Sequence, residues 1–169
     1  MRNRKIFSIF TLFQPNVTMK NLDLLYKAYF NNRFKTLTPE QFEVFVLYSP
    51  PLMVVACDQV VDHDEMQYVE HFSEFIARTF RDTLPHEAAR EELNQTLESE
   101  MRFLLAHIEE WELRMLEAAR ELLRDDQEIK QQVYELLEMF ARSSEGVSQV
   151  ESEKIEHICR YLSIKPPVD

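Results

Sequence analysis

The sequence predicts an all-α fold, and three observations support this. The chain of 169 residues contains a single glycine, whereas sheets and hairpins usually need glycine at their turns. Residues that favour helices, such as Glu, Leu, Gln, Arg and Ala, are abundant. Apolar residues recur at intervals of three and four, the spacing of one helix face. We therefore expect a helical bundle with two pseudo-repeated helix-turn-helix units and a long helical insertion between them.

The first half of the chain predicts four helices. Leucines and tyrosines at helical spacing indicate a helix over about 22–34. Residues 38–41 (TPEQ) predict a helix start, because Thr can cap, Pro suits the first helical position and Gln completes a capping box. The SPP segment at 49–51 must interrupt that helix, and a nearly uniformly apolar, buried helix begins at Pro50. An amphipathic helix is expected over 63–79.

The second half contains one uncertain stretch and two clear helices. Apolar spacing does not clearly break over 86–123. One helix of that length would be roughly 57 Å long at 1.5 Å per residue, too long for a small domain. We expect either a kink near 94–96 or a projecting helical arm that mediates dimerisation. Two further helices are expected, one over about 125–141 with a capping box that starts at Asp125, and one over 149–162.

Charge divides the chain into a basic arm and an acidic body. Residues 1–35 hold seven bases and one acid, a net charge of +6, whereas the rest holds twelve bases and twenty-nine acids, a net charge of −17. The acidic body, residues 36–169, should repel nucleic acid, so none is expected as a partner. The aromatic-rich arm either folds back on this body or docks on a membrane surface or a protein partner.

Cysteine usage and hydropathy favour a cytoplasmic protein. Cys57 and Cys159 both lie on apolar faces, so we expect buried, reduced thiols and no disulfide. No run of about 18 uncharged apolar residues is present, which predicts no membrane span. Residues 1–18 imitate a signal peptide, but the apolar stretch is short and no small-residue cleavage site follows. Met19 is an alternative start.

Acidic residues are concentrated in the turn before residue 66. Asp58, Asp62, Asp64 and Glu65 lie within eight residues, and carboxylates this close either face solvent or share a hard cation. An EF-hand is excluded, because counting from Asp58 places His63 where glycine is required.

Helix capping is the alternative explanation of these carboxylates. Asp62 and Glu65 have the spacing of a capping box, in which each satisfies a backbone N–H of the other residue. Ser148 and Glu151 repeat this spacing before the last helix. Capping alone needs no metal.

Two segments, 56–65 and 141–151, resemble the repeated signature of the TerB-like family, which is named for tellurite resistance. That signature is an Ala-rich helix end, Asp-Gly-x-Val/Ile-Ser/Asp-x-x-Glu and an amphipathic helix. The chain departs from it at Gln59 in the Gly place, and at Ser144 and Glu145 in the places of Asp and Gly. The resemblance covers roughly residues 40–80 and 127–164.

The resemblance implies a site for one divalent cation, Ca²⁺, Mg²⁺ or Mn²⁺, between the two turns. Carried over by position, its ligands are Asp58 and Glu65 from the first turn and Glu151 from the second, with Asp62 as their neighbour. The loss of the Asp at Ser144 removes one oxygen ligand, and a hard cation needs several.

No enzymatic motif is present. The sequence lacks a Gly-rich phosphate loop, a His-Glu-x-x-His motif and a nucleophile elbow, and we expect no catalysis. The prediction is a TerB-like cytoplasmic module for stress response and protein interaction, in which a cation acts as a clip or sensor. The alternative is a metal-free scaffold that binds a protein partner, or forms a homodimer, through the long helix or the arm. A metal-dependent hydrolase is the third class.

Overall fold

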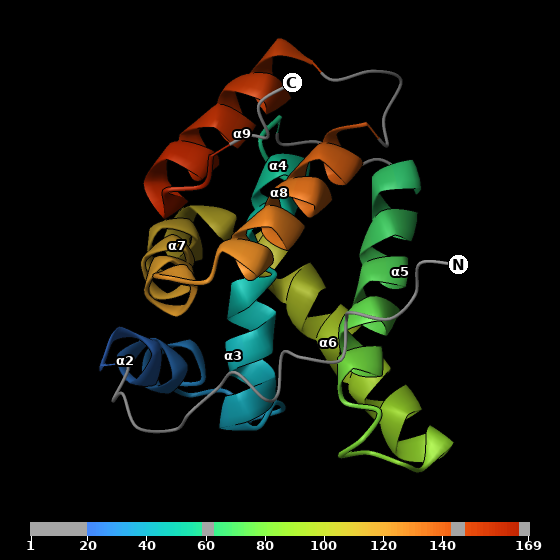
Figure 1. Cartoon of the computed structure of the whole chain (residues 1–169). Coiled ribbons are helices and arrows are strands. Elements are labelled where there is room, and N and C mark those ends of the chain that lie inside the picture. Colours follow the sequence, from blue (N-terminus) through green and yellow to red (C-terminus); the bar gives the residue numbers. More distant parts are fainter. Residues whose placement is uncertain (1–19, 59–62, 143–147, 166–169) are drawn as a thin grey trace.

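The computed structural model describes residues 20–58, 63–142 and 148–165. These ranges form helices without any strand, which confirms the all-α bundle (Figure 1). In chain order the helices are α2 (Lys20–Tyr29), α3 (Pro39–Leu47), α4 (Pro50–Val55), α5 (His63–Thr79), α6 (Glu87–Ala106), α7 (Ile108–Leu123), α8 (Gln127–Ala141) and α9 (Gln149–Leu162). Across the described ranges, every helix is too short or too polar to cross a lipid bilayer.

The short helix α4 lies in the middle of the bundle. All six of its residues are buried, and it contacts α6, α7, α8 and α9. It begins at Pro50, as predicted, because proline has no N–H to lose at the first helical position. Since α4 is surrounded, its end fixes where the following turn leaves the core.

The part of the N-terminal arm that the structure describes, residues 20–35, belongs to the same core. Helix α2 packs on α3 and α7 and buries Leu22, Leu25 and Tyr29. It ends earlier than the predicted residue 34, because Asn32 has a left-handed conformation (φ 60°) that stops the helix. Residues 1–19 lie outside the described ranges.

The predicted long helix is two helices, and the kink expected near 94–96 is wrong. Residues 94–96 continue α6, and the break falls at His107 (φ −128°, ψ 28°). The break lets α6 pack along α5 while α7 turns to pack on α2, α3 and α9. Helix α7 is therefore part of the core and does not project as an arm, and its apolar residues, among them Trp111, Met115 and Leu116, are buried.

The capping residues predicted from the sequence are confirmed for two helices and wrong by one position for a third. Thr38 and Ser148 each form the predicted capping box. Helix α8 is capped by Asp126, not by the predicted Asp125, and its Oδ1 accepts a hydrogen bond from Ile129 N at 2.9 Å. Val150, at the start of α9, is half exposed.

Candidate functional site

The two acidic helix starts lie at the same end of the bundle. Helices α5 and α9 both begin at the upper end in Figure 1, where α4 and α8 end. Glu65 and Glu151 are each the third residue of their helix. Both are buried, with exposed fractions of 6% and 7%. Asp58 is exposed just after α4, and Asp62 lies outside the described residues.

Glu151 already has a structural role. The backbone N–H of Ser148 donates to Glu151 Oε2 at 2.6 Å, and the N–H of Glu151 donates to Ser148 Oγ at 3.2 Å. A carboxylate here also stabilises the positive end of the helix dipole. Capping therefore accounts for one oxygen of Glu151 without a cation.

Glu65 occupies the equivalent position in α5, and it is buried to the same degree. A buried carboxylate is unfavourable unless polar or charged groups compensate it. Glu65 lies in the first turn of α5, where the helix dipole favours negative charge.

The thiol of Cys57 is affected by carboxylates from both acidic turns. The pKa of its thiol is raised, first by burial and then by the negative charges of Glu151 and Asp58, while Lys154 opposes the shift. Because α4 packs directly on α9, Cys57, two residues after α4, lies close enough to Glu151 for its charge to raise the thiol pKa. The two residues are almost one hundred positions apart in the sequence. Both cysteines are free thiols, and Cys159 is buried, whereas Cys57 is partly exposed and not buried as we had expected.

The described donors do not assemble into a cation site by themselves. Among residues 20–58, 63–142 and 148–165, no three His, Cys, Asp or Glu side chains converge in a way that could hold a metal ion. Asp58, Glu65 and Glu151 thus provide an acidic neighbourhood without forming a group of three ligands. The site with Asp62 remains a prediction.

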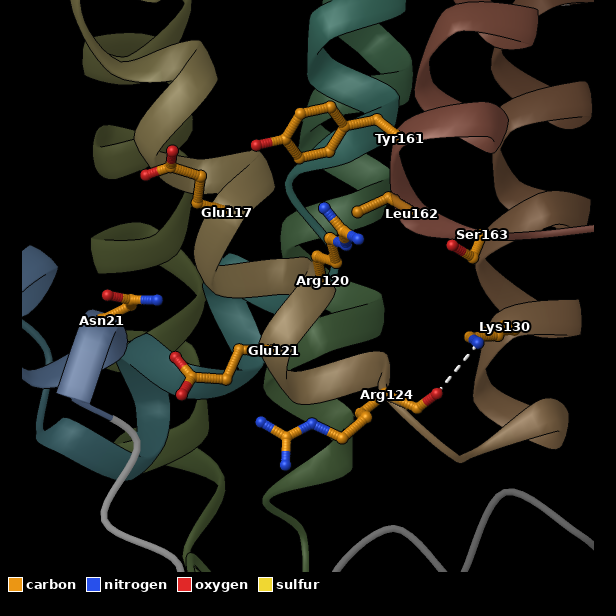
Figure 2. Close-up of a pocket in the computed structure, with 9 residues that line it drawn as sticks. All are labelled: Asn21, Glu117, Arg120, Glu121, Arg124, Lys130, Tyr161, Leu162 and Ser163. Atoms are coloured by element: carbon orange, nitrogen blue, oxygen red, sulfur yellow. Dashed lines mark hydrogen bonds between the residues drawn. The ribbon is translucent and has the colours of Figure 1, made fainter.

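A second polar site was missed by the sequence analysis. A cavity of about 580 Å³ lies at the other end of α8 and α9 and is lined mainly by charged and polar side chains (Figure 2). Three of these, Glu117, Arg120 and Glu121, lie on one face of α7, and a fourth, Arg124, directly follows the last residue of this helix. Their spacing of three and four was the available signal, but it is also typical of an ordinary solvated helix face.

Comparison with protein-family models, with curated proteins and with solved structures finds no match to this chain. The likeness to the TerB-like family therefore rests on the two short motifs.

Proposed function

We propose that this protein is a non-catalytic, TerB-like interaction module of the cytoplasm that acts in stress response through a protein partner. In this proposal, one Ca²⁺, Mg²⁺ or Mn²⁺ ion joins the two helix-turn-helix units. The observation that carries it is the equivalent placement of Glu65 and Glu151, both buried at the third position of helices that begin at one end of the bundle.

The chemistry of these residues suits a hard cation. The ligand set is Asp58, Asp62, Glu65 and Glu151, and carboxylate oxygens are what Ca²⁺, Mg²⁺ and Mn²⁺ prefer. Bound, the cation supplies positive charge where the negative charges are crowded. The carboxylates would then fix the starts of α5 and α9 relative to the end of α4, so that the arrangement of the two units depends on cation concentration.

A metal-free scaffold is the second candidate, and a specific contact favours it. Glu151 Oε2 is held at 2.6 Å by the backbone N–H of Ser148, which gives this carboxylate a role in capping α9. If the same is true of Glu65, the acidic turns need no ion, and partner binding depends on the helical surface alone.

Calorimetric titration of the full chain with Ca²⁺, Mg²⁺ and Mn²⁺, after treatment with a chelator, tests the cation. We expect one ion per chain and a rise in thermal stability, since a ligand at a hundred times its Kd stabilises by about 2.7 kcal/mol. Asp58→Asn should abolish the heat, because it removes one of the proposed ligands. Asp58 is exposed, so its loss leaves the core intact.

Asp82→Asn is the matched control, because Asp82 is an exposed aspartate in the turn after α5. It should bind the ion as the unaltered chain does. If no cation gives heat and none raises the melting temperature, the metal-free scaffold is the correct function.

A further inference from the structure

The polar cavity between α2, α7, α8 and α9 (Figure 2) has the features of a ligand site. We propose that it binds a small phosphorylated polyol, such as a sugar phosphate or a nucleotide. Arg120, Arg124 and Lys130 would bind the phosphate, and Glu117 and Glu121 would accept hydrogen bonds from hydroxyl groups.

Lys130 is the first observation that points to an anion. It is only 7% exposed, and its Nζ donates to the carbonyl oxygen of Arg124 at 3.0 Å. It makes no ion pair with any residue in the described ranges. An ammonium has three donors, and buried charges are normally paired. The cavity wall therefore carries a buried ammonium that forms no ion pair with a carboxylate of the described ranges.

The charged face of α7 is the second observation. Glu117, Arg120, Glu121 and Arg124 alternate in sign along this face, yet none of them forms an ion pair with a described residue. Elsewhere in the molecule, glutamate and arginine four residues apart form ion pairs, as Glu98 and Arg102 do at 2.7 Å, whereas on this face the residues four apart have the same charge. The four side chains instead line the cavity (Figure 2).

An unpaired acceptor indicates what else the ligand must carry. Glu121 Oε2 is buried and has no hydrogen-bond partner among the residues that the structure describes. A bare anion would be repelled by it, whereas a hydroxyl group would donate to it. Tyr161 adds a ring at the cavity, with the Arg120 guanidinium 5.7 Å from its centroid. A ligand with both a phosphate and hydroxyl groups satisfies the basic and the acidic side chains together.

The size and chemistry of the cavity agree with such a ligand. Small-molecule sites usually have volumes of roughly 300–1,000 Å³, and the cavity measures about 580 Å³. Arginine forks match phosphate geometry, and a phosphate monoester carries a charge of about −1.5 to −2 near neutral pH.

Calorimetric titration of the full chain with four probes tests the proposal. We expect ribose 5-phosphate to bind, ribose to give no heat, and inorganic phosphate to bind at least about tenfold more weakly, since it lacks the sugar hydroxyls that would donate to the glutamates. AMP distinguishes the two kinds of ligand, a nucleotide and a sugar phosphate. Tighter binding of AMP than of ribose 5-phosphate identifies a nucleotide, and weaker binding identifies a sugar phosphate.

Arg120 and Arg124 are exposed, so variants at these two positions should fold normally. Arg120→Gln and Arg124→Gln should each weaken ribose 5-phosphate binding about tenfold, because each removes a charge-assisted hydrogen bond. Glu121→Gln should weaken the binding of ribose 5-phosphate, because it removes an acceptor for a hydroxyl group. It should strengthen the binding of inorganic phosphate, because it removes a negative charge that repels the anion. Arg81→Gln, at an exposed arginine outside the cavity, should change neither.

Three results would each overturn the proposal. The first is that inorganic phosphate binds as tightly as ribose 5-phosphate, which would leave Glu117 and Glu121 without a role. The second is that no phosphorylated probe binds, and the third is that binding is unchanged in both arginine variants.

Discussion

Arg33 and Glu100 form an ion pair that joins the segment after α2 to the middle of α6. The Arg33 Nη2 atom donates to both carboxylate oxygens of Glu100, at 3.1 and 3.0 Å, and Thr36 Oγ1 donates to Oε1 at 2.7 Å. Glu100 is only 2% exposed. The guanidinium carbon of Arg33 also lies 3.5 Å from the ring centroid of Phe103. This cluster fixes the position of the N-terminal part of the chain on the bundle.

Arg33→Met should lower the free energy of unfolding by about 3 kcal/mol, because it leaves the carboxylate of Glu100 buried without its counter-charge. The double variant Arg33→Met/Glu100→Met should recover much of that loss, since no buried charge remains. Urea denaturation at pH 7 measures both values. Arg78→Met is the control, because Arg78 pairs with Glu74 on the exposed face of α5, and such surface pairs contribute less than about 1 kcal/mol. A double variant no more stable than Arg33→Met would contradict this explanation.

Ser148→Ala should destabilise the protein by about 1 kcal/mol, because it removes the hydroxyl that accepts the N–H of Glu151 at the start of α9. If this loss of stability is measured in the presence of a chelator, it reflects the capping interaction alone, without any contribution from a bound cation. Ser152→Ala, one turn further along α9, should cost little, since alanine is the better helix former. Equal losses in the two variants would show that the capping box contributes nothing specific.

The capping boxes also show which features were predictable from the sequence. Thr38 with Gln41, and Ser148 with Glu151, act over three residues, so the local sequence contains the whole interaction. The start of α4 at Pro50 is local in the same sense. The break at His107 is different, because no residue there forbids a helix. It depends on α7 finding partners in α2, α3 and α9, and these contacts are distant in sequence.

The candidate sites also combine features that the local sequence predicts with features that depend on distant contacts. The equivalence of Glu65 and Glu151 was visible in the motif, but the contribution of Glu151 to the electrostatics of Cys57 depends on how α4 packs on α9. The cavity beside α7 could not be predicted, because a run such as Glu117 to Arg124 looks the same whether it faces solvent or lines a hollow. The burial of Lys130, which distinguishes the two, is a tertiary property.

The reactivity of Cys57 reports the charge at the acidic end of the bundle. Burial and the carboxylates of Glu151 and Asp58 raise the pKa of this thiol, and Lys154 lowers it. Glu151→Gln, which keeps an acceptor for the cap, should therefore lower the pKa and speed alkylation by iodoacetamide at pH 8 by roughly twofold or more. Lys154→Gln should slow it. The rates are measured in a Cys159→Ala background, so that only one thiol reacts.

A bound cation should act on this thiol in the same direction as Glu151→Gln, because it adds positive charge near the carboxylates. Faster alkylation with added Mn²⁺, reversed by a chelator, would support the cation independently of calorimetry. If Glu151→Gln and Lys154→Gln shift the rate in the same direction, the electrostatic explanation fails.

Alkaline pH should destabilise the protein through Cys159. Burial, with a smaller contribution from the charge of Glu138, raises the pKa of this thiol from 9.0 to about 11. In the unfolded chain the thiol loses its proton near pH 9, whereas the folded chain retains it until about pH 11. The unfolded state therefore binds fewer protons in this window, and the free energy of unfolding falls as pH rises, by about 1.4 kcal/mol per pH unit for one group.

Urea denaturation at pH 8, 9, 10 and 11 under reducing conditions measures this slope. Cys159→Ala should start from a lower stability at pH 8, because it leaves a small cavity beside α8, but it should decline less steeply up to pH 11. Tyr48→Phe is the companion variant. Burial, with a smaller contribution from Asp126, raises the pKa of Tyr48 from 10.0 to about 12, so this variant should flatten the decline only above about pH 10. Equal slopes for Cys159→Ala and the unaltered chain between pH 9 and 11 would show that the thiol ionises alike in both states.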